Sequence, residues 1–116
     1  MISVSLIVND KNRSLRLKVK GHAGQAIFGQ DIVCASASIL TYTVAQIVTD
    51  MAGKGLLETE PTIILDSGDA TVECISKDDT AYSEALNGYY VAMVGYQLLA
   101  HNYPQFVELK IVGEVE

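Results

Sequence analysis

The chain of 116 residues is long enough for one domain with a single modest core. Its composition, 49% hydrophobic and 19% charged, is typical of a globular protein, and its net charge of −6 argues against direct binding to nucleic-acid backbones, which needs clustered Lys and Arg. No apolar run approaches the ~20 residues that span a bilayer, and residues 1–5 lack the basic start of a signal peptide. We therefore expect a cytoplasmic protein without membrane contact.

The hydrophobic periodicity predicts seven elements in one domain, residues 1–116. Apolar residues alternate over 2–8 and 15–19, which predicts two strands and a hairpin. A helical pattern follows from about 32 to 52, with Gly53 as its C′ residue, and short strands follow at 63–65 and 70–76. Residues 78–80 can cap a second helix that Asn102-Tyr103-Pro104 ends, before a closing strand at 107–111. The order β-β-α-β-β-α-β predicts an α+β two-layer sandwich, with two long helices on one face of a mostly antiparallel sheet.

The stretch from 21 to 38 carries the candidate chemistry. Asp31 is a good N-cap residue, which would place Cys34 in the first turn of the long helix. Free N–H groups and the positive end of the helix dipole favour a thiolate there, and His22 on the preceding loop would complete a thiol–imidazole pair. The residues alone leave a second reading open, in which Cys34 is an inert core thiol and His22 a polar surface residue.

Several other positions carry open alternatives. Gly21, Gly24 and Gly29 are either hinges of a loop over the site or simple turn residues. Ile27 and Phe28 either cover a substrate groove as a lid or wall, or pack into the core.

Three features lie outside this stretch. Gly88 and Gly95 lie on nearly one face of the second helix and would allow close packing on the sheet or on a second subunit. Cys74, in a strand, is expected to be a small buried hydrophobe. No paired His/Cys spacing predicts a metal site.

Two motifs resemble a known family. They are Gly21-His22-Ala23 followed by 29–35 (Gly-Gln-Asp-Ile-Val-Cys-Ala), with Ser36 and Ser38 in the helix, and the later segment 95–100 with Tyr103-Pro104. Together they resemble the ribosomal-processing cysteine protease family of Firmicutes and related bacteria. The resemblance implies an endopeptidase that removes the N-terminal extension of large-subunit ribosomal protein L twenty-seven. It also implies a homodimer, no cofactor, and an apolar and aromatic substrate segment.

In that family the histidine, the cysteine and the motif aspartate fall on His22, Cys34 and Asp31. The implied chemistry is acyl transfer, in which the Cys34 thiolate attacks and His22 moves the proton. We expect backbone N–H groups of the first helical turn, including that of Cys34, to bind the oxyanion. Asp31 either caps the helix, which we favour, or orients His22. Ser38 is expected to be a supporting residue of the site.

Two rival functions remain at this stage. One is a non-catalytic acidic protein that binds a basic ribosomal component during assembly. The other is a thiol oxidoreductase, which would need Cys74 as a resolving cysteine because no C-x-x-C motif is present.

Overall fold

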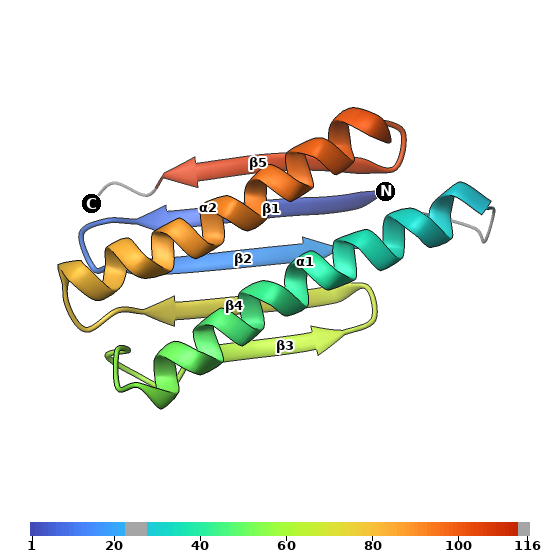
Figure 1. Cartoon of the computed structure of the whole chain (residues 1–116). Helices are drawn as coiled ribbons and strands as arrows, with labels where there is room; N and C mark the ends of the chain where they lie inside the picture. Colours follow the sequence, from blue (N-terminus) through green and yellow to red (C-terminus); the bar gives the residue numbers. More distant parts are fainter. Residues whose placement is uncertain (23–27, 114–116) are drawn as a thin grey trace.

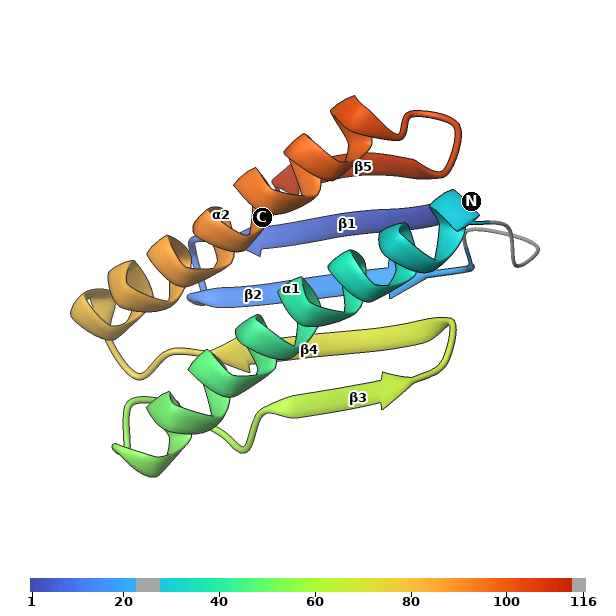
Figure 2. The ribbon, with the colours of Figure 1, turned by 45° about the vertical axis from the view of Figure 1, so that its right-hand side comes forward.

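The computed structural model describes residues 1–22 and 28–113, and of residues 28–31 it describes only the backbone. The elements are Ile2–Asn9 (β1), Ser14–Lys20 (β2), Phe28–Gly53 (α1), Thr62–Asp66 (β3), Asp69–Ile75 (β4), Asp79–Asn102 (α2) and Val107–Gly113 (β5). The strands form a sheet of order β3-β4-β2-β1-β5, and both helices cover the same face of it (Figures 1 and 2). The predicted two-layer α+β sandwich is confirmed.

The sheet is antiparallel except at one junction. β1 pairs with β2, β2 with β4 and β4 with β3, all antiparallel, whereas β5 lies parallel to β1. Along β1 the side chains alternate between buried and half-buried, as the sequence alternation requires. The pairing of β2 with β4 sets Lys20 opposite Asp69, so the end of β2 lies beside the turn that joins β3 to β4.

The second helix begins and ends where the sequence predicts. The carboxylate of Asp78 accepts a hydrogen bond from the Ala81 N–H at 2.8 Å, which satisfies one of the free donors of the first turn. At the other end the Tyr103 N–H donates to the Leu99 carbonyl, and Pro104 follows. The predicted cap and stop of α2 are therefore confirmed.

The first helix differs from its prediction at both ends. It begins at Phe28 rather than at Ile32, and it continues through Gly53. The glycine that terminates it is Gly55, which has φ +71°. The Gly55 N–H donates to Ala52 and the Leu56 N–H to Met51, a Schellman arrangement in which only glycine accepts the left-handed conformation without strain.

The glycines of α2 contact the other helix. A Cβ at Gly95 would lie 2.5 Å from Cδ2 of Leu40, and a Cβ at Gly88 would lie 3.1 Å from Cδ1 of Ile47. Leu40 and Ile47 both belong to α1. The expectation that Gly88 and Gly95 allow α2 to pack closely on the sheet or on a second subunit is therefore wrong. The two glycines instead admit side chains of α1 into the surface of α2.

One stretch of α1, Ile32–Gly53, is long and apolar enough by length and composition to cross a membrane. This differs from the expectation that no apolar run reaches that length. In the structure α1 lies over the sheet, and Val33, Val44 and Val48 are fully buried beneath it. Core helices of globular domains pass the same test of length and composition, and one face of α1 packs against the sheet.

Two tyrosines of α2 anchor the interface between the helices and the sheet. The Tyr89 hydroxyl donates to the Val72 carbonyl at 3.0 Å and contacts the sulfur of Cys74, and the Tyr96 hydroxyl lies 2.5 Å from that of Thr41. Cys74 is buried, as predicted, and burial raises the pKa of its thiol. Burial also raises the pKa of Tyr96 to about 12 and raises that of Tyr89 further.

These tyrosines predict a loss of stability in alkali. Their pKa values in the folded protein lie above the unfolded value of ~10, so the stability contributed by the neutral phenols is complete below that pH and is lost above it. We expect the free energy of unfolding to fall by about 1.4 kcal/mol per pH unit for each tyrosine. Urea denaturation at a series of pH values between about 7 and 11.5 measures the free energy of unfolding. Tyr96→Phe should reduce the slope, and a stability that stays constant across pH 9 to 11.5 would contradict the assignment.

Candidate active site

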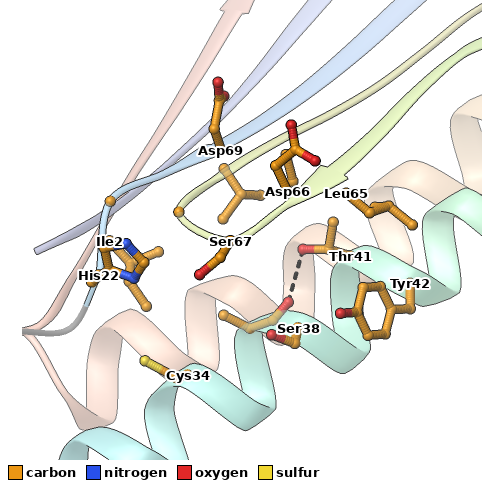
Figure 3. A pocket seen from close by; sticks show the side chains of 15 residues that line it. Ile2, His22, Cys34, Ser38, Thr41, Tyr42, Leu65, Asp66, Ser67 and Asp69 are labelled. Atoms are coloured by element: carbon orange, nitrogen blue, oxygen red, sulfur yellow. Dashed lines mark hydrogen bonds between the residues drawn. The ribbon is translucent and has the colours of Figure 1, made fainter. Parts of the chain in front are cut away.

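A pocket of about 370 Å³ lies where α1 passes the end of β2 and the turn between β3 and β4. Figure 3 shows its two sides, with Cys34, Ser38 and Tyr42 on α1 and His22 and Ser67 opposite them. The sulfur of Cys34 and the imidazole of His22 lie at the same end of the pocket. The predicted pairing of these two residues in one site agrees with this placement.

Cys34 lies in the second turn of α1 and is half-buried against the core. Ser38 and Tyr42 follow at steps of four, so the three side chains share one face of the helix and line the pocket together. Cys74 does not line this pocket and is buried in β4 under Tyr89. Of the two thiols, Cys34 is therefore the one presented to a ligand.

His22 follows the end of β2 and is held through its backbone. The Gly21 N–H donates to the Gly68 carbonyl at 2.9 Å, and the Met1 nitrogen donates to the His22 carbonyl at 2.6 Å. The imidazole itself is exposed and lies against Gly68 in the turn between β3 and β4. Backbone hydrogen bonds with Met1 and with Gly68 therefore fix the position of His22 from both sides.

Gly21 is required by this geometry. Its φ is +94°, in the left-handed region, and a Cβ there would lie 3.5 Å from the carbonyl carbon of Met1 and closer still to the oxygen. Because the obstacle is backbone rather than a flexible side chain, no other residue fits without moving β1 or the end of β2.

Part of the predicted substrate loop belongs to the helix. Gly24 and Ile27 lie outside the described residues. Phe28 and Gly29 form the start of α1, so the expected loop over 21–30 ends before Phe28, and the proposed hinge at Gly29 is wrong. The residues of the expected loop that line the pocket within the described part of the chain are Gly21 and His22.

The earlier start of α1 also corrects two expectations about the site. Asp31 is a helical residue and not the N-cap, because the helix begins at Phe28. Only the first four N–H groups of a helix lack an intrahelical partner, and Cys34 lies beyond them, so its N–H is not free to bind an oxyanion. The effect of the helix dipole, which falls off within the first turn, is correspondingly weaker at Cys34 than expected.

The hydroxyl of Ser38 differs from those of the other serine and threonine residues of α1. Ser36, Thr41, Thr43 and Thr49 each donate to the carbonyl four residues earlier, at 2.7 to 2.8 Å. Among the described residues, no hydrogen bond is formed by the hydroxyl of Ser38, which lines the pocket. Ser67 presents a second hydroxyl from the opposite side (Figure 3).

Tyr42 and residues 66–69, which join β3 to β4, line the pocket but are not among the site residues predicted from the sequence. Tyr42 was detectable, because counting in fours from Cys34 gives Ser38 and then Tyr42. The place of residues 66–69 beside His22 depends on the pairing of β2 with β4. No local signal carries that information. Within the described ranges, no group of three or more His, Cys, Asp or Glu residues is arranged to hold a metal ion.

Comparison with known proteins agrees with the geometry of the pocket. The family model described as cysteine protease Prp matches residues 1–108. The ribosomal processing cysteine protease Prp of Staphylococcus aureus is 28% identical over 109 residues, which are 94% of this chain and 97% of the relative.

Solved structures give the same result. The S. aureus ribosomal processing protease Prp with a covalently linked product peptide has a TM-score of 0.69 at 28% identity, over 96% of this chain and 99% of that one. A protein of Streptococcus mutans has a TM-score of 0.67 at 25% identity, and the match covers 98% of this chain and 96% of that one. Since the family match spans residues 1–108 and both His22 and the half-buried Cys34 line one pocket, this chain is a cysteine protease that belongs to the ribosomal processing Prp family.

Proposed function

We propose that this protease removes the N-terminal extension of large-subunit ribosomal protein L twenty-seven, with Cys34 as nucleophile and His22 as general base and acid. The observation that carries the proposal is the pocket that both of these side chains line. The net charge of −6 further supports attraction to a basic ribosomal protein.

The reaction is an acyl transfer. The thiolate of Cys34 attacks the scissile carbonyl, and the proton of the thiol passes to His22, which delivers it to the leaving amine. Water then hydrolyses the thioester and regenerates the thiol. Ser38 and Ser67 are the side-chain donors that we assign to the oxyanion, because both hydroxyls line the pocket and the N–H of Cys34 lies within the helix.

The decisive experiment is incubation with the extended ribosomal protein, followed by mass measurement of the products. We expect two fragments whose masses place a single cut at the end of the extension, formed at a rate proportional to enzyme concentration. A Cys34→Ala preparation purified in parallel serves as the control for contaminating proteases. An intact substrate after prolonged incubation with the wild-type enzyme would overturn the substrate assignment.

The pocket also predicts a contact for apolar or aromatic substrate residues. Tyr42 is 51% exposed and Leu65 is 42% exposed, and both line the pocket beside the catalytic pair. Large exposed apolar side chains at a pocket gain free energy when a substrate covers them.

We therefore expect Tyr42→Ala to lower kcat/KM by about tenfold, mainly through KM, because an aromatic contact of ~1.4 kcal/mol is lost. Initial rates over a range of substrate concentrations measure both constants. Tyr90→Ala is the matched control, since Tyr90 is a 39% exposed tyrosine of α2 that does not line the pocket. Equal kinetics for Tyr42→Ala and Tyr90→Ala would exclude Tyr42 from substrate binding.

A cytoplasmic homodimer is the assembly that we propose. The outer face of the two helices carries exposed apolar side chains, among them Ile39 of α1 and Val91 and Leu98 of α2. A face of this kind is typical of a surface covered by a second subunit. Sedimentation velocity distinguishes dimer from monomer, and Val91→Glu should shift a dimer toward the monomer.

A further inference from the structure

We propose that Gly68, in the turn between β3 and β4, is a positioning residue for the imidazole of His22. Packing of the ring against this glycine orients the imidazole, as a hydrogen-bonding partner does in many catalytic triads. The inference rests on the proposed function, in which His22 moves the proton of Cys34. It deepens that function by naming what holds the general base.

The first observation is the contact itself. A Cβ added to Gly68 would lie 2.8 Å from Cε1 and 3.2 Å from Cδ2 of His22, and closer still to Nε2. The ring therefore covers the side of Gly68 where every other residue carries its side chain. Only glycine leaves this space to the imidazole.

The second observation is a backbone tie between the same two segments. The Gly21 N–H donates to the Gly68 carbonyl at 2.9 Å, and the pairing of Lys20 with Asp69 fixes the register of the strands that lead into them. Gly68 thus holds His22 at two points, through the backbone just before it and at the Nε2 side of its ring.

The third observation concerns the ring nitrogens. Among the described residues no hydrogen bond reaches either of them, although Asp66 and Asp69 belong to the same turn. In a triad the base is oriented by a third group that hydrogen-bonds to it. Here the orientation comes from packing of the ring against Gly68, with Nε2 as the ring atom nearest to an added Cβ.

The expected effect follows from the sensitivity of catalysis to geometry. Displacing a catalytic group by about 1 Å costs on the order of 100-fold in rate. We expect Gly68→Ala to lower kcat by about 10- to 100-fold while KM changes by less than about threefold, because the substrate contacts of α1 remain.

A set of matched variants separates positioning from backbone strain. Gly68 has φ +75°, and Gly55 has φ +71° with nothing within 4 Å of a Cβ added to it. Gly55→Ala therefore introduces the same kind of strain without touching any side chain. Asparagine tolerates this conformation better than alanine does but still carries a Cβ. We expect Gly68→Ala and Gly68→Asn to lose activity alike, whereas Gly55→Ala and Gly55→Asn keep the wild-type kcat.

Two further measurements report on His22 directly. The pH dependence of kcat/KM should change in both Gly68 variants and remain that of the wild type in both Gly55 variants. The imidazole resonances of His22, one of two histidines in the chain and assigned with His101→Gln, should shift in the Gly68 variants only.

The inference is overturned if Gly68→Asn recovers the wild-type kcat, or if the Gly55 variants lose as much activity as the Gly68 variants, because strain would then explain the loss. Unchanged His22 resonances in Gly68→Ala would overturn it as well. Failure of the proposed function looks different, since the wild-type enzyme would then leave the ribosomal protein intact. The resonances of His22 would still decide whether Gly68 positions the ring.

Discussion

Cys34→Ala and Cys34→Ser should each lower kcat/KM by at least about 10³-fold while leaving the protein folded. The thiol is the one nucleophile of the proposed mechanism, and an alcohol at the same position is far less nucleophilic at neutral pH. Because Cys34 is only half-buried at the edge of the core, neither substitution opens a large cavity. Progress curves recorded by mass measurement give kcat/KM, and thermal melts of the same preparations show whether the protein is folded.

Cys74 supplies the control for this experiment. It is buried in β4 and contacts the Tyr89 hydroxyl, so Cys74→Ser places a polar group in the core at a cost of about 1–3 kcal/mol. We expect lower stability with nearly normal activity. Substantial turnover by either Cys34 variant would remove Cys34 from the role of nucleophile, and loss of activity in a stable Cys74→Ser protein would show that Cys74 belongs to the site.

His22→Ala should lower kcat by about 10²-fold or more, the usual effect of removing a general base and acid. The side chain is exposed and its place is fixed by backbone hydrogen bonds of Gly21 and Met1, so its removal should leave the fold unchanged. The pH–rate profile should lose the limb that the imidazole produces. His101→Ala is the matched control, because His101 lies at the end of α2 and outside the pocket.

A profile of unchanged shape in His22→Ala, with kcat reduced or not, would mean that another group moves the proton. Alkylation of Cys34 offers a check that does not depend on the substrate. If His22 assists formation of the thiolate, His22→Ala should slow the reaction of Cys34 with iodoacetamide near neutral pH, while Cys74 stays unreactive in both proteins.

The parts of the fold that depend on local patterns could be predicted from the sequence. The alternation in β1 and the cap at Asp78 are properties of a few adjacent residues, and both agree with the structure. The start of α1 could not be predicted in this way. Asp31 has the chemistry of an N-cap, but the helix continues back to Phe28.

The same limit applies to the site. His22 and Cys34 could be proposed from the sequence because their motif lies within one short stretch, which the family resemblance made specific, and both line the pocket. Gly68 was found only from the structure, because its contact with His22 requires β4 to pair with β2 across the sheet. The partners of Gly88 and Gly95 likewise required knowledge of how α2 crosses α1. Contacts between distant segments carry no periodic signal in the sequence.

The position of β3 has a consequence for how the enzyme loses activity. β3 is an edge strand, and its residues from Thr62 to Asp66 are exposed except for the half-buried Ile63. Edge hairpins of this kind open locally at a lower free-energy cost than the central strands and helices of the same domain. Since the β3–β4 turn forms one side of the pocket, the site depends on the least protected part of the sheet. The enzyme can therefore fail through partial opening of one hairpin while its helices and central strands remain intact.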